Sequence, residues 1–449
     1  MAVLLTASLT MGRVGGDVGV HEPVSITTAS GFLPTRLSDV PGDGAAGPLW
    51  QDLSGPFGTS VDVDVTSLRT ASGVGLLAGL SRLSLGDIST FVADNPAKID
   101  RLLAAPPAAT KVAEMWSGLG GPERAALAAA APRLVGNLDG VPARERGRAN
   151  ERYLDQTVSD VQRRLKAADG AAAGPLGQEL SMLAQVRAAL QSGDGGPRRS
   201  LILLDATGGG RAAIALGNPD TADFVSYLVP GLNYGVEAQL VNWSATADAL
   251  YAEQSEVLAR RAAAHPGTPA ASVATIAWIG YETPDLFNVG GLDRAEVGAD
   301  FLEKSWLGLR SARGSHQPFI SVLAHSYGST VSLVALARGS VDVDAFVMVG
   351  SPGSAVQSVD ELSVKHGNVY VGEADWDPAV NSAFFGSDPG AASYGAHRLG
   401  VSGAHDRVTG TWLDGSLGHN AYFTPGSESL HNMALISTDN AKLATNGSE

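Results

Sequence analysis

The stretch that decides the fold is FISVLAHSYGSTVSLVALA, residues 319–337. Its first residues form an apolar, β-branched run that predicts a buried strand, and its last residues predict a helix. Ser326 stands at the junction, with Ala324 two residues before it and Gly328 two residues after it. A sharp strand-to-helix turn needs small residues at these positions, because strand and helix approach closely there. The pattern predicts a nucleophile elbow around Ser326, with Ala at the first small position where Gly is usual.

Backbone N–H groups close to Ser326 are expected to stabilise a developing oxyanion. Tyr327 offers one N–H, because it begins the helix behind the nucleophile. The second is expected after the predicted strand of residues 224–229, where Gly231 lets the backbone turn close to a substrate and Leu232 supplies the N–H. The residues expected to line the pocket are Gly231, His325 and Tyr281.

Catalysis by a serine requires a general base and an acid that orients the base, since a hydroxyl is a weak nucleophile at neutral pH. In an elbow of this kind the three residues follow the order Ser, acid, His. The predicted strand of residues 368–372 leads into EADWDP, so the acid is Asp375 or Asp377. His419, in a loop before the last predicted helix, is one candidate for the base. The other candidates are His405 and His431.

A family resemblance is carried by several motifs in this chain. These motifs are the surroundings of Ser326, GSPG at residues 350–353, GNLDGVP at residues 136–142 and RAN at residues 148–150. Together they resemble an actinobacterial α/β-hydrolase family long catalogued as a domain of unknown function. The likeness extends over roughly residues 115–437. It implies a serine hydrolase core preceded by a family-specific helical segment, and it implies little about the substrate.

The same resemblance ranks the candidates for the acid and the base. The family's acid lies in an Asp-Pro pair, which matches Asp377 followed by Pro378. Its base lies in a Gly-His pair followed by a small polar residue and Tyr-Phe, which matches His419. The resemblance therefore implies a triad of Ser326, Asp377 and His419, with Asp375 as the main rival for the acid.

Three regions follow from composition and periodicity along the 449 residues. Residues 1–75, rich in Gly, Pro, Ser and Asp, are predicted to be an irregular arm. Residues 76–195 carry apolar positions at helical spacing and are predicted to be a helical accessory region. In residues 196–449 apolar strands alternate with helices, which indicates a mostly parallel sheet with helices on both faces. The expected architecture is an α/β-hydrolase fold preceded by a mainly helical region.

Composition excludes several classes of function. The chain has no Cys, so a thiolate metal site and a cysteine nucleophile are excluded. The formal net charge of −15 repels polyanions and argues against a nucleic-acid partner. Gly208-Gly209-Gly210 lacks the Lys and Ser/Thr of a phosphate loop and is interpreted as a hairpin turn. His and acidic residues show no close metal-ligand spacing, so neither a metal nor a cofactor is predicted.

The first eleven residues are apolar but lack a positively charged region, and they are too short to span a bilayer. No later stretch reaches transmembrane length without charges or glycines. We therefore expect no stable membrane insertion. The sequence favours a cytoplasmic location over secretion or association with the cell envelope.

The predicted reaction is acyl transfer to water. His419, oriented by Asp377, would take the proton of Ser326 as its oxygen attacks the carbonyl of a small-molecule or lipid ester. An amidase or peptidase with the same triad is one alternative. A hydrolase-fold protein used for binding is another, but an intact set of Ser, Asp and His argues for an enzyme.

Overall fold

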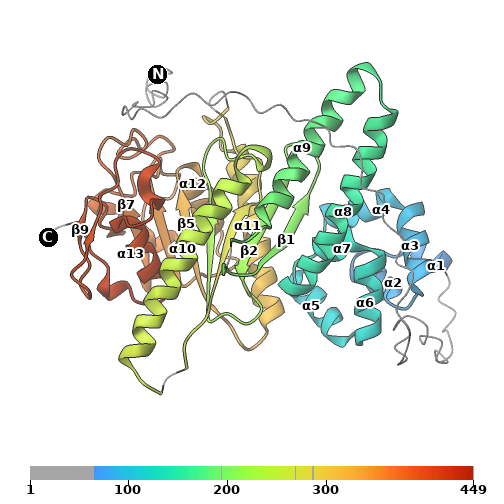
Figure 1. The fold of residues 1–449 in the computed structure, drawn as a ribbon, viewed down its shortest axis with the longest axis horizontal. Coiled ribbons are helices and arrows are strands. Elements are labelled where there is room, and N and C mark those ends of the chain that lie inside the picture. Colours follow the sequence, from blue (N-terminus) through green and yellow to red (C-terminus); the bar gives the residue numbers. More distant parts are fainter. Residues whose placement is uncertain (1–64, 194, 268, 286–287, 448–449) are drawn as a thin grey trace, which may run out of the picture. The chain divides into compact units, whose positions relative to one another are not determined.

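A computed structural model describes residues 65–193, 195–267, 269–285 and 288–447 (Figure 1). The predicted arm therefore lies outside the described residues up to residue 64. From residue 65 the chain is helical, as far as residue 189. The helices are α1 (Val65–Thr70), α2 (Gly73–Leu80), α3 (Leu85–Asp94), α4 (Pro96–Ala104), α5 (Ala109–Gly118), α6 (Gly121–Ala130), α7 (Pro132–Gly136), α8 (Ala143–Ala167) and α9 (Ala173–Ala189).

An eight-stranded sheet follows, in the order β1-β2-β4-β3-β5-β6-β7-β8. Its strands are β1 (Arg199–Asp205), β2 (Arg211–Gly217), β3 (Phe224–Val229), β4 (Val273–Ile279), β5 (Phe319–His325), β6 (Ala345–Val349), β7 (Val369–Gly372) and β8 (His397–Arg398). β2 runs antiparallel to β1 and β4, and the pairs from β4 through β3 to β8 are parallel. The mostly parallel sheet predicted from the apolar runs is confirmed, and β1 and β2 form the hairpin around Gly208-Gly209-Gly210.

Helices cover both faces of this sheet (Figure 1). The helices are α10 (Val236–Ala264), α11 (Asp293–Arg313), α12 (Tyr327–Ala337) and α13 (Glu428–Ser437), and a short hairpin of β9 (Ala404–His405) and β10 (Trp412–Leu413) precedes α13. Neighbouring residues of β5 point to opposite faces, as in any strand. Leu323 packs in one core cluster with residues of α10 and α13, whereas Val322 packs in another with residues of α11 and α12. A strand with both faces buried is mostly apolar, which is why β6 is a continuous apolar run and β4 is interrupted only by Thr275.

The helical segment is attached to the sheet through the GNLDGVP and RAN motifs. Asn150 on α8 is fully buried, and its Nδ2 donates to the carbonyl oxygens of Gly136 at 2.8 Å and Leu201 at 2.9 Å. A Cβ atom on Gly136 would lie 1.9 Å from Asn150 Oδ1, so glycine is required there. Asn137 Oδ1 accepts the N–H of Leu204 at 2.9 Å. These bonds join α7 and α8 to β1.

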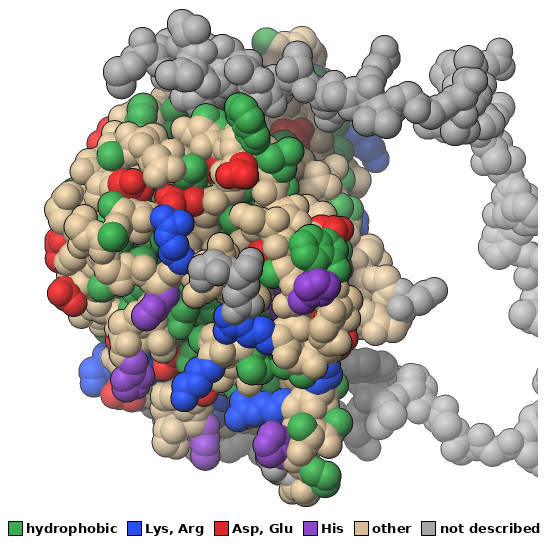
Figure 2. All heavy atoms as spheres, turned by 90° about the vertical axis from the view of Figure 1, so that its left-hand side faces the viewer, with side chains coloured by type: hydrophobic (Ala, Val, Ile, Leu, Met, Phe, Trp, Pro, Cys, Tyr) green, Lys and Arg blue, Asp and Glu red, His purple; other side chains and the backbone are tan. Residues whose placement is uncertain are grey.

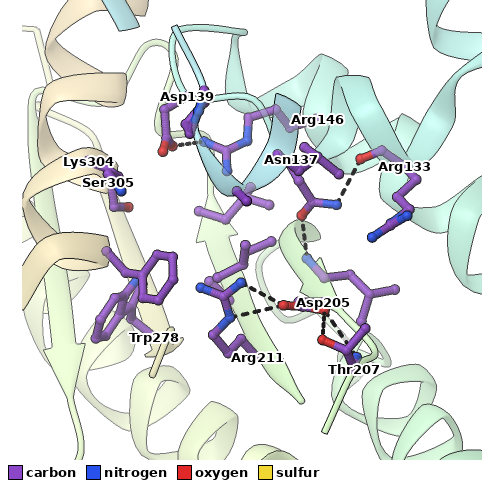
Figure 3. Close-up of a pocket in the computed structure, with 18 of the residues that line it drawn as sticks. Arg133, Asn137, Asp139, Arg146, Asp205, Thr207, Arg211, Trp278, Lys304 and Ser305 are labelled. Carbon is purple, nitrogen blue, oxygen red and sulfur yellow. Dashed lines mark hydrogen bonds and ion pairs between the residues drawn. The ribbon is translucent and has the colours of Figure 1, made fainter. Parts of the chain in front are cut away.

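A cavity of about 540 Å³ lies beside these contacts (Figure 3). Side chains of α7, α8, β1, β2 and α11 surround it, and several of them form ion pairs. Arg146 Nη1 lies 2.7 Å from Asp139 Oδ1, and Arg211 Nη2 lies 2.6 Å from Asp205 Oδ2. The arginines of the cavity wall are thus neutralised by the protein's own carboxylates.

The molecular surface carries charges of both signs. Figure 2 shows acidic and basic side chains interspersed with polar and apolar ones over one face. Within the described residues, no helix has the length and apolar character needed to cross a bilayer.

The contacts of Asn150 generate a stability prediction. Asn150→Ala removes a buried donor from two carbonyl oxygens, so we expect the free energy of unfolding to fall by about 2 kcal/mol. Urea unfolding followed by circular dichroism measures this. The matched control is Asn242→Ala. Asn242 is exposed on α10, and among the described residues its side-chain amide donates to Gln239; the effect of this change should stay within about 0.5 kcal/mol. Equal losses for both variants would contradict the assignment.

Candidate active site

Ser326 lies in the sharp turn between β5 and α12. Its backbone has a φ of 55° and a ψ of −131°, a strained conformation for a residue with a side chain that costs on the order of 1–3 kcal/mol. A Cβ atom on Gly328 would lie 2.4 Å from the carbonyl oxygen of Val229, so only glycine fits at this position. Ala324 is fully buried in β5, and the first small position therefore has room for a methyl group.

His419 and Asp377 lie in line with the serine hydroxyl. His419 Nε2 is 2.8 Å from Ser326 Oγ, and His419 Nδ1 is 2.8 Å from Asp377 Oδ1. The carboxylate of Asp377 can only accept, so Nδ1 carries the proton of the neutral imidazole and Nε2 accepts from the serine. This is the arrangement in which the imidazole can take the serine proton.

The environment of Asp377 keeps its carboxyl group ionised. Burial would raise the pKa of Asp377, but hydrogen bonds from His419 and Tyr422 outweigh it and hold the pKa below the ordinary value. The backbone N–H of Ala379 also donates to Asp377 Oδ1, at 2.9 Å. Gly350, from the GSPG motif, leaves room for this pair, because a Cβ atom there would lie 2.8 Å from Asp377 Oδ2.

The turn after β3 lies directly against the serine. A Cβ atom on Gly231 would be 2.6 Å from Ser326 Cβ and 3.0 Å from Ser326 Oγ, so glycine is required for this approach. Leu232 follows in this turn, and Tyr327 begins α12. Within the described part of the chain, neither of their N–H groups has a hydrogen-bond acceptor. The approach of Gly231 thus places the turn that contains Leu232 next to Ser326.

The comparisons with known proteins agree with this fold. A family model described as "Alpha/beta hydrolase" matches residues 205–387. The uncharacterized protein Rv0963c of Mycobacterium tuberculosis is 33% identical over 196 residues, which cover 43% of this chain and 72% of that protein. The chain belongs to the α/β-hydrolase family. The resemblance noted in the sequence to an actinobacterial α/β-hydrolase family is confirmed.

A second relative of this α/β-hydrolase covers more of it. The uncharacterized protein Rv2079 of Mycobacterium tuberculosis is 30% identical over 412 residues, which are 79% of this chain. The chain spans 60% of the length of that relative. Among solved structures, an esterase of Pyrobaculum calidifontis matches 63% of this chain and 97% of its own, with 16% identity and a TM-score of 0.33; nothing about activity follows from this likeness.

The rival candidates for the acid and the base lie elsewhere in this α/β-hydrolase. Asp375 is exposed, and its backbone carbonyl accepts the N–H of Gly418 at 2.8 Å. His405 is exposed on β9, with Nδ1 3.0 Å from the carbonyl oxygen of Gly410. The third rival, His431, is buried on α13. None of the three is brought to Ser326 in the described structure.

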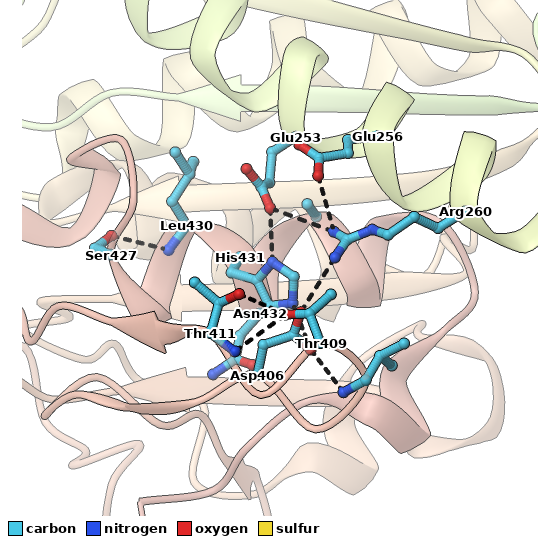
Figure 4. A network of polar contacts seen from close by, with 12 residues as sticks. Glu253, Glu256, Arg260, Asp406, Thr409, Thr411, Ser427, Leu430, His431 and Asn432 are labelled. Carbon is cyan, nitrogen blue, oxygen red and sulfur yellow. Dashed lines mark hydrogen bonds and ion pairs between the residues drawn. The ribbon is translucent and has the colours of Figure 1, made fainter.

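Figure 4 shows the polar contacts of His431. Its Nδ1 lies 2.6 Å from Glu253 Oε1 on α10, and its Nε2 lies 3.6 Å from Asp406 Oδ1. Arg260 Nη1 lies 3.1 Å from the other carboxylate oxygen of Asp406. His431 thus takes part in a polar network that joins α10, α13 and the β9–β10 hairpin.

Two of the residues expected to line the pocket are buried. Tyr281 is 1% exposed, and its hydroxyl donates to the carbonyl oxygen of Pro230 at 2.7 Å. It therefore supports the turn that contains Leu232. His325 is 3% exposed, and its Nε2 lies 2.6 Å from the carbonyl oxygen of His419. His325 therefore donates to the backbone of the loop that carries His419.

One residue of the site was not singled out in the sequence. Tyr422 is fully buried and donates its hydroxyl proton to Asp377 Oδ2 at 2.6 Å. Its position three residues after His419 is the signal in the sequence, because it places Tyr422 in the same loop as His419. Among the described residues, no cluster of three or more His, Asp or Glu side chains could hold a metal ion.

The burial of His325 leads to a prediction about pH. Burial, together with the nearby His419, lowers the pKa of His325 to about 3, whereas an unfolded histidine has a pKa of about 6.5. Between these values only the unfolded chain binds this proton, so this contribution to stability is present above pH 6.5 and is lost as the pH falls toward 3.

We expect the imidazole signals of His325 to stay constant from pH 8 to pH 5 in an NMR titration of the folded protein. In urea-unfolded protein they should titrate with the ordinary histidine pKa. The spectrum of His325→Gln assigns the resonance. Titration of the folded-state signal near pH 6.5 would contradict the buried, neutral state.

Proposed function

We propose that the protein is a serine hydrolase that cleaves carboxylic esters through an acyl-enzyme on Ser326. The observation that supports this best is the unbroken chain of hydrogen bonds from Ser326 Oγ through His419 to Asp377, with 2.8 Å at each step. The strained elbow and the two available N–H groups beside it fit the same chemistry.

Acylation begins with attack on the ester carbonyl. Ser326 Oγ bonds to the carbonyl carbon while its proton passes to His419 Nε2, and Asp377 stabilises the resulting imidazolium. The N–H groups of Leu232 and Tyr327 hold the negatively charged oxygen of the tetrahedral intermediate. The bond from carbon to the alcohol oxygen then breaks, and His419 returns the proton to the departing alcohol.

Deacylation repeats these steps with water. His419 Nε2 takes a proton from a water molecule whose oxygen attacks the acyl carbon, and the same two N–H groups hold the oxyanion. The carbon–oxygen bond to Ser326 breaks, the serine regains its proton, and a carboxylic acid leaves.

Ester cleavage needs no catalytic group beyond those proposed for this site. An alcohol is a good leaving group once it receives one proton, and His419 supplies that proton. A small-molecule or lipid ester is therefore proposed ahead of an amide or peptide. We also propose a helical accessory region (residues 76–195) and a catalytic domain (residues 196–449). The arm predicted for residues 1–75 is helical over Val65–Thr70 and from Gly73 onward, so its described part is not irregular.

Removal of the nucleophile tests the reaction. Ser326→Ala should lower the turnover of p-nitrophenyl acetate by at least about a thousandfold, and it should abolish labelling by a fluorophosphonate probe in intact-mass spectrometry. The matched control is Ser315→Ala in the exposed loop before β5, which should behave as the wild type. Unchanged ester turnover in folded Ser326→Ala would refute the proposed function.

The assignment of the acid is tested separately. Asp377→Asn keeps the shape of the side chain but cannot stabilise an imidazolium, so kcat should fall by about 10⁴-fold. Asp375→Asn, two residues away and exposed, should retain kcat within about threefold. His419→Ala and His405→Ala form a second matched pair for the base. Loss of activity in Asp375→Asn, with Asp377→Asn active, would reverse the assignment.

A further inference from the structure

Asp377 has no exposed side-chain surface, so each of its carboxylate oxygens depends on donors from the protein. Oδ1 accepts from His419 Nδ1 and from the N–H of Ala379. Oδ2 accepts from the hydroxyl of Tyr422 at 2.6 Å. A buried carboxylate oxygen without a donor is costly, and Oδ2 depends on this hydroxyl alone among the hydrogen bonds of the described residues.

The direction of the Tyr422 proton is fixed by its second contact. The N–H of Ala374 donates to the tyrosine oxygen at 2.9 Å. An N–H cannot accept, so the single hydroxyl proton of Tyr422 points to Asp377. Burial, and then the charge of Asp377, raises the pKa of Tyr422 well above its usual value. Tyr422 therefore keeps this proton and remains a donor to Asp377 at neutral pH.

The same hydroxyl connects two loops. Tyr422 belongs to a short 3-10 helix, Ala421–Phe423, in the loop that carries His419, whereas Ala374 belongs to the loop that carries Asp377. The backbone of Tyr422 is held in turn, because Ser429 Oγ on α13 donates to its carbonyl oxygen at 2.5 Å. Tyr422 is thus held at its hydroxyl and at its backbone carbonyl oxygen, and it joins the loop that carries His419 to the loop that carries Asp377.

We propose that Tyr422 is a positioning residue for the reaction on Ser326: its hydroxyl keeps Asp377 ionised and turns Oδ1 toward His419. The proposal rests on the proposed function. Tyr422 does not touch the substrate or Ser326, and it acts only through the carboxylate of Asp377.

The expected effect of Tyr422→Phe follows from the lost donor. The aromatic ring stays, but Asp377 Oδ2 is left without a partner, so kcat toward p-nitrophenyl acetate should fall by about tenfold with little change in KM. The pair of Asp377 and His419 should also bind a proton more readily. The acid limb of the kcat/KM profile should therefore move to higher pH, by about one pH unit. The titratable groups that face Asp377 are His419, Tyr422, His325 and Glu373.

A second buried tyrosine provides the control. Tyr394 is 2% exposed, and within the described residues its hydroxyl has no hydrogen-bond partner. Tyr394→Phe removes the same atom from another part of the core, and kcat and the pH profile should not change. Thermal unfolding of both variants measures any loss of stability, so a general weakening of the fold is separated from the effect on the acid.

A double-mutant cycle decides whether Tyr422 acts through Asp377. Added to Asp377→Asn, the change Tyr422→Phe should cost less than twofold in kcat, because the carboxylate is already gone. A full tenfold loss in that background, or an unmoved acid limb in the single variant, would overturn the proposal. Different results would refute the proposed function. In that case the wild-type protein would not hydrolyse the ester, or Ser326→Ala would be as active as the wild type.

Discussion

The site depends on one close approach, that of α12 to the end of β3 at Gly328. The ideal Cβ position of this residue is 2.4 Å from the carbonyl oxygen of Val229 and 2.5 Å from that of Pro230. Because no side chain is present, α12 can start directly behind the strand, and the chain must turn sharply at Ser326. The same contact brings the turn of Gly231 and Leu232 against the serine. The positions of Ser326 and of the turn beside it therefore depend on the same steric constraint.

Much of the core could be predicted from the sequence because it follows periodicity and turn chemistry. A strand buried on both faces is apolar at nearly every position, so β4, β5 and β6 were recognisable as near-continuous apolar runs. The elbow was recognisable from the spacing of Ala324, Ser326 and Gly328. Both signals are local, and neither depends on knowing which strands are neighbours.

Such reasoning could not choose between Asp375 and Asp377, because both lie in the same short loop. The difference between them arises at Trp376, whose φ of 62° reverses the backbone between the two acids. Asp375 is consequently exposed, and Asp377 is buried beside His419. The burial of His325 and Tyr281 could not be predicted from the sequence either, because it depends on loops that are far away in the sequence. Each holds a backbone carbonyl of the site, at His419 and at Pro230.

The bonds that Asn137 and Asn150 make to β1 have a consequence for the sheet as a whole. β1 is the outermost strand on its side, and an outermost strand presents unpaired N–H and C=O groups to which another chain can add. Asn150 occupies the carbonyl of Leu201, and Asn137 occupies the N–H of Leu204. Side chains of the helical segment thus take the place of a neighbouring strand. These two backbone groups of β1 are therefore already bonded within the chain and cannot pair with the strand of another molecule.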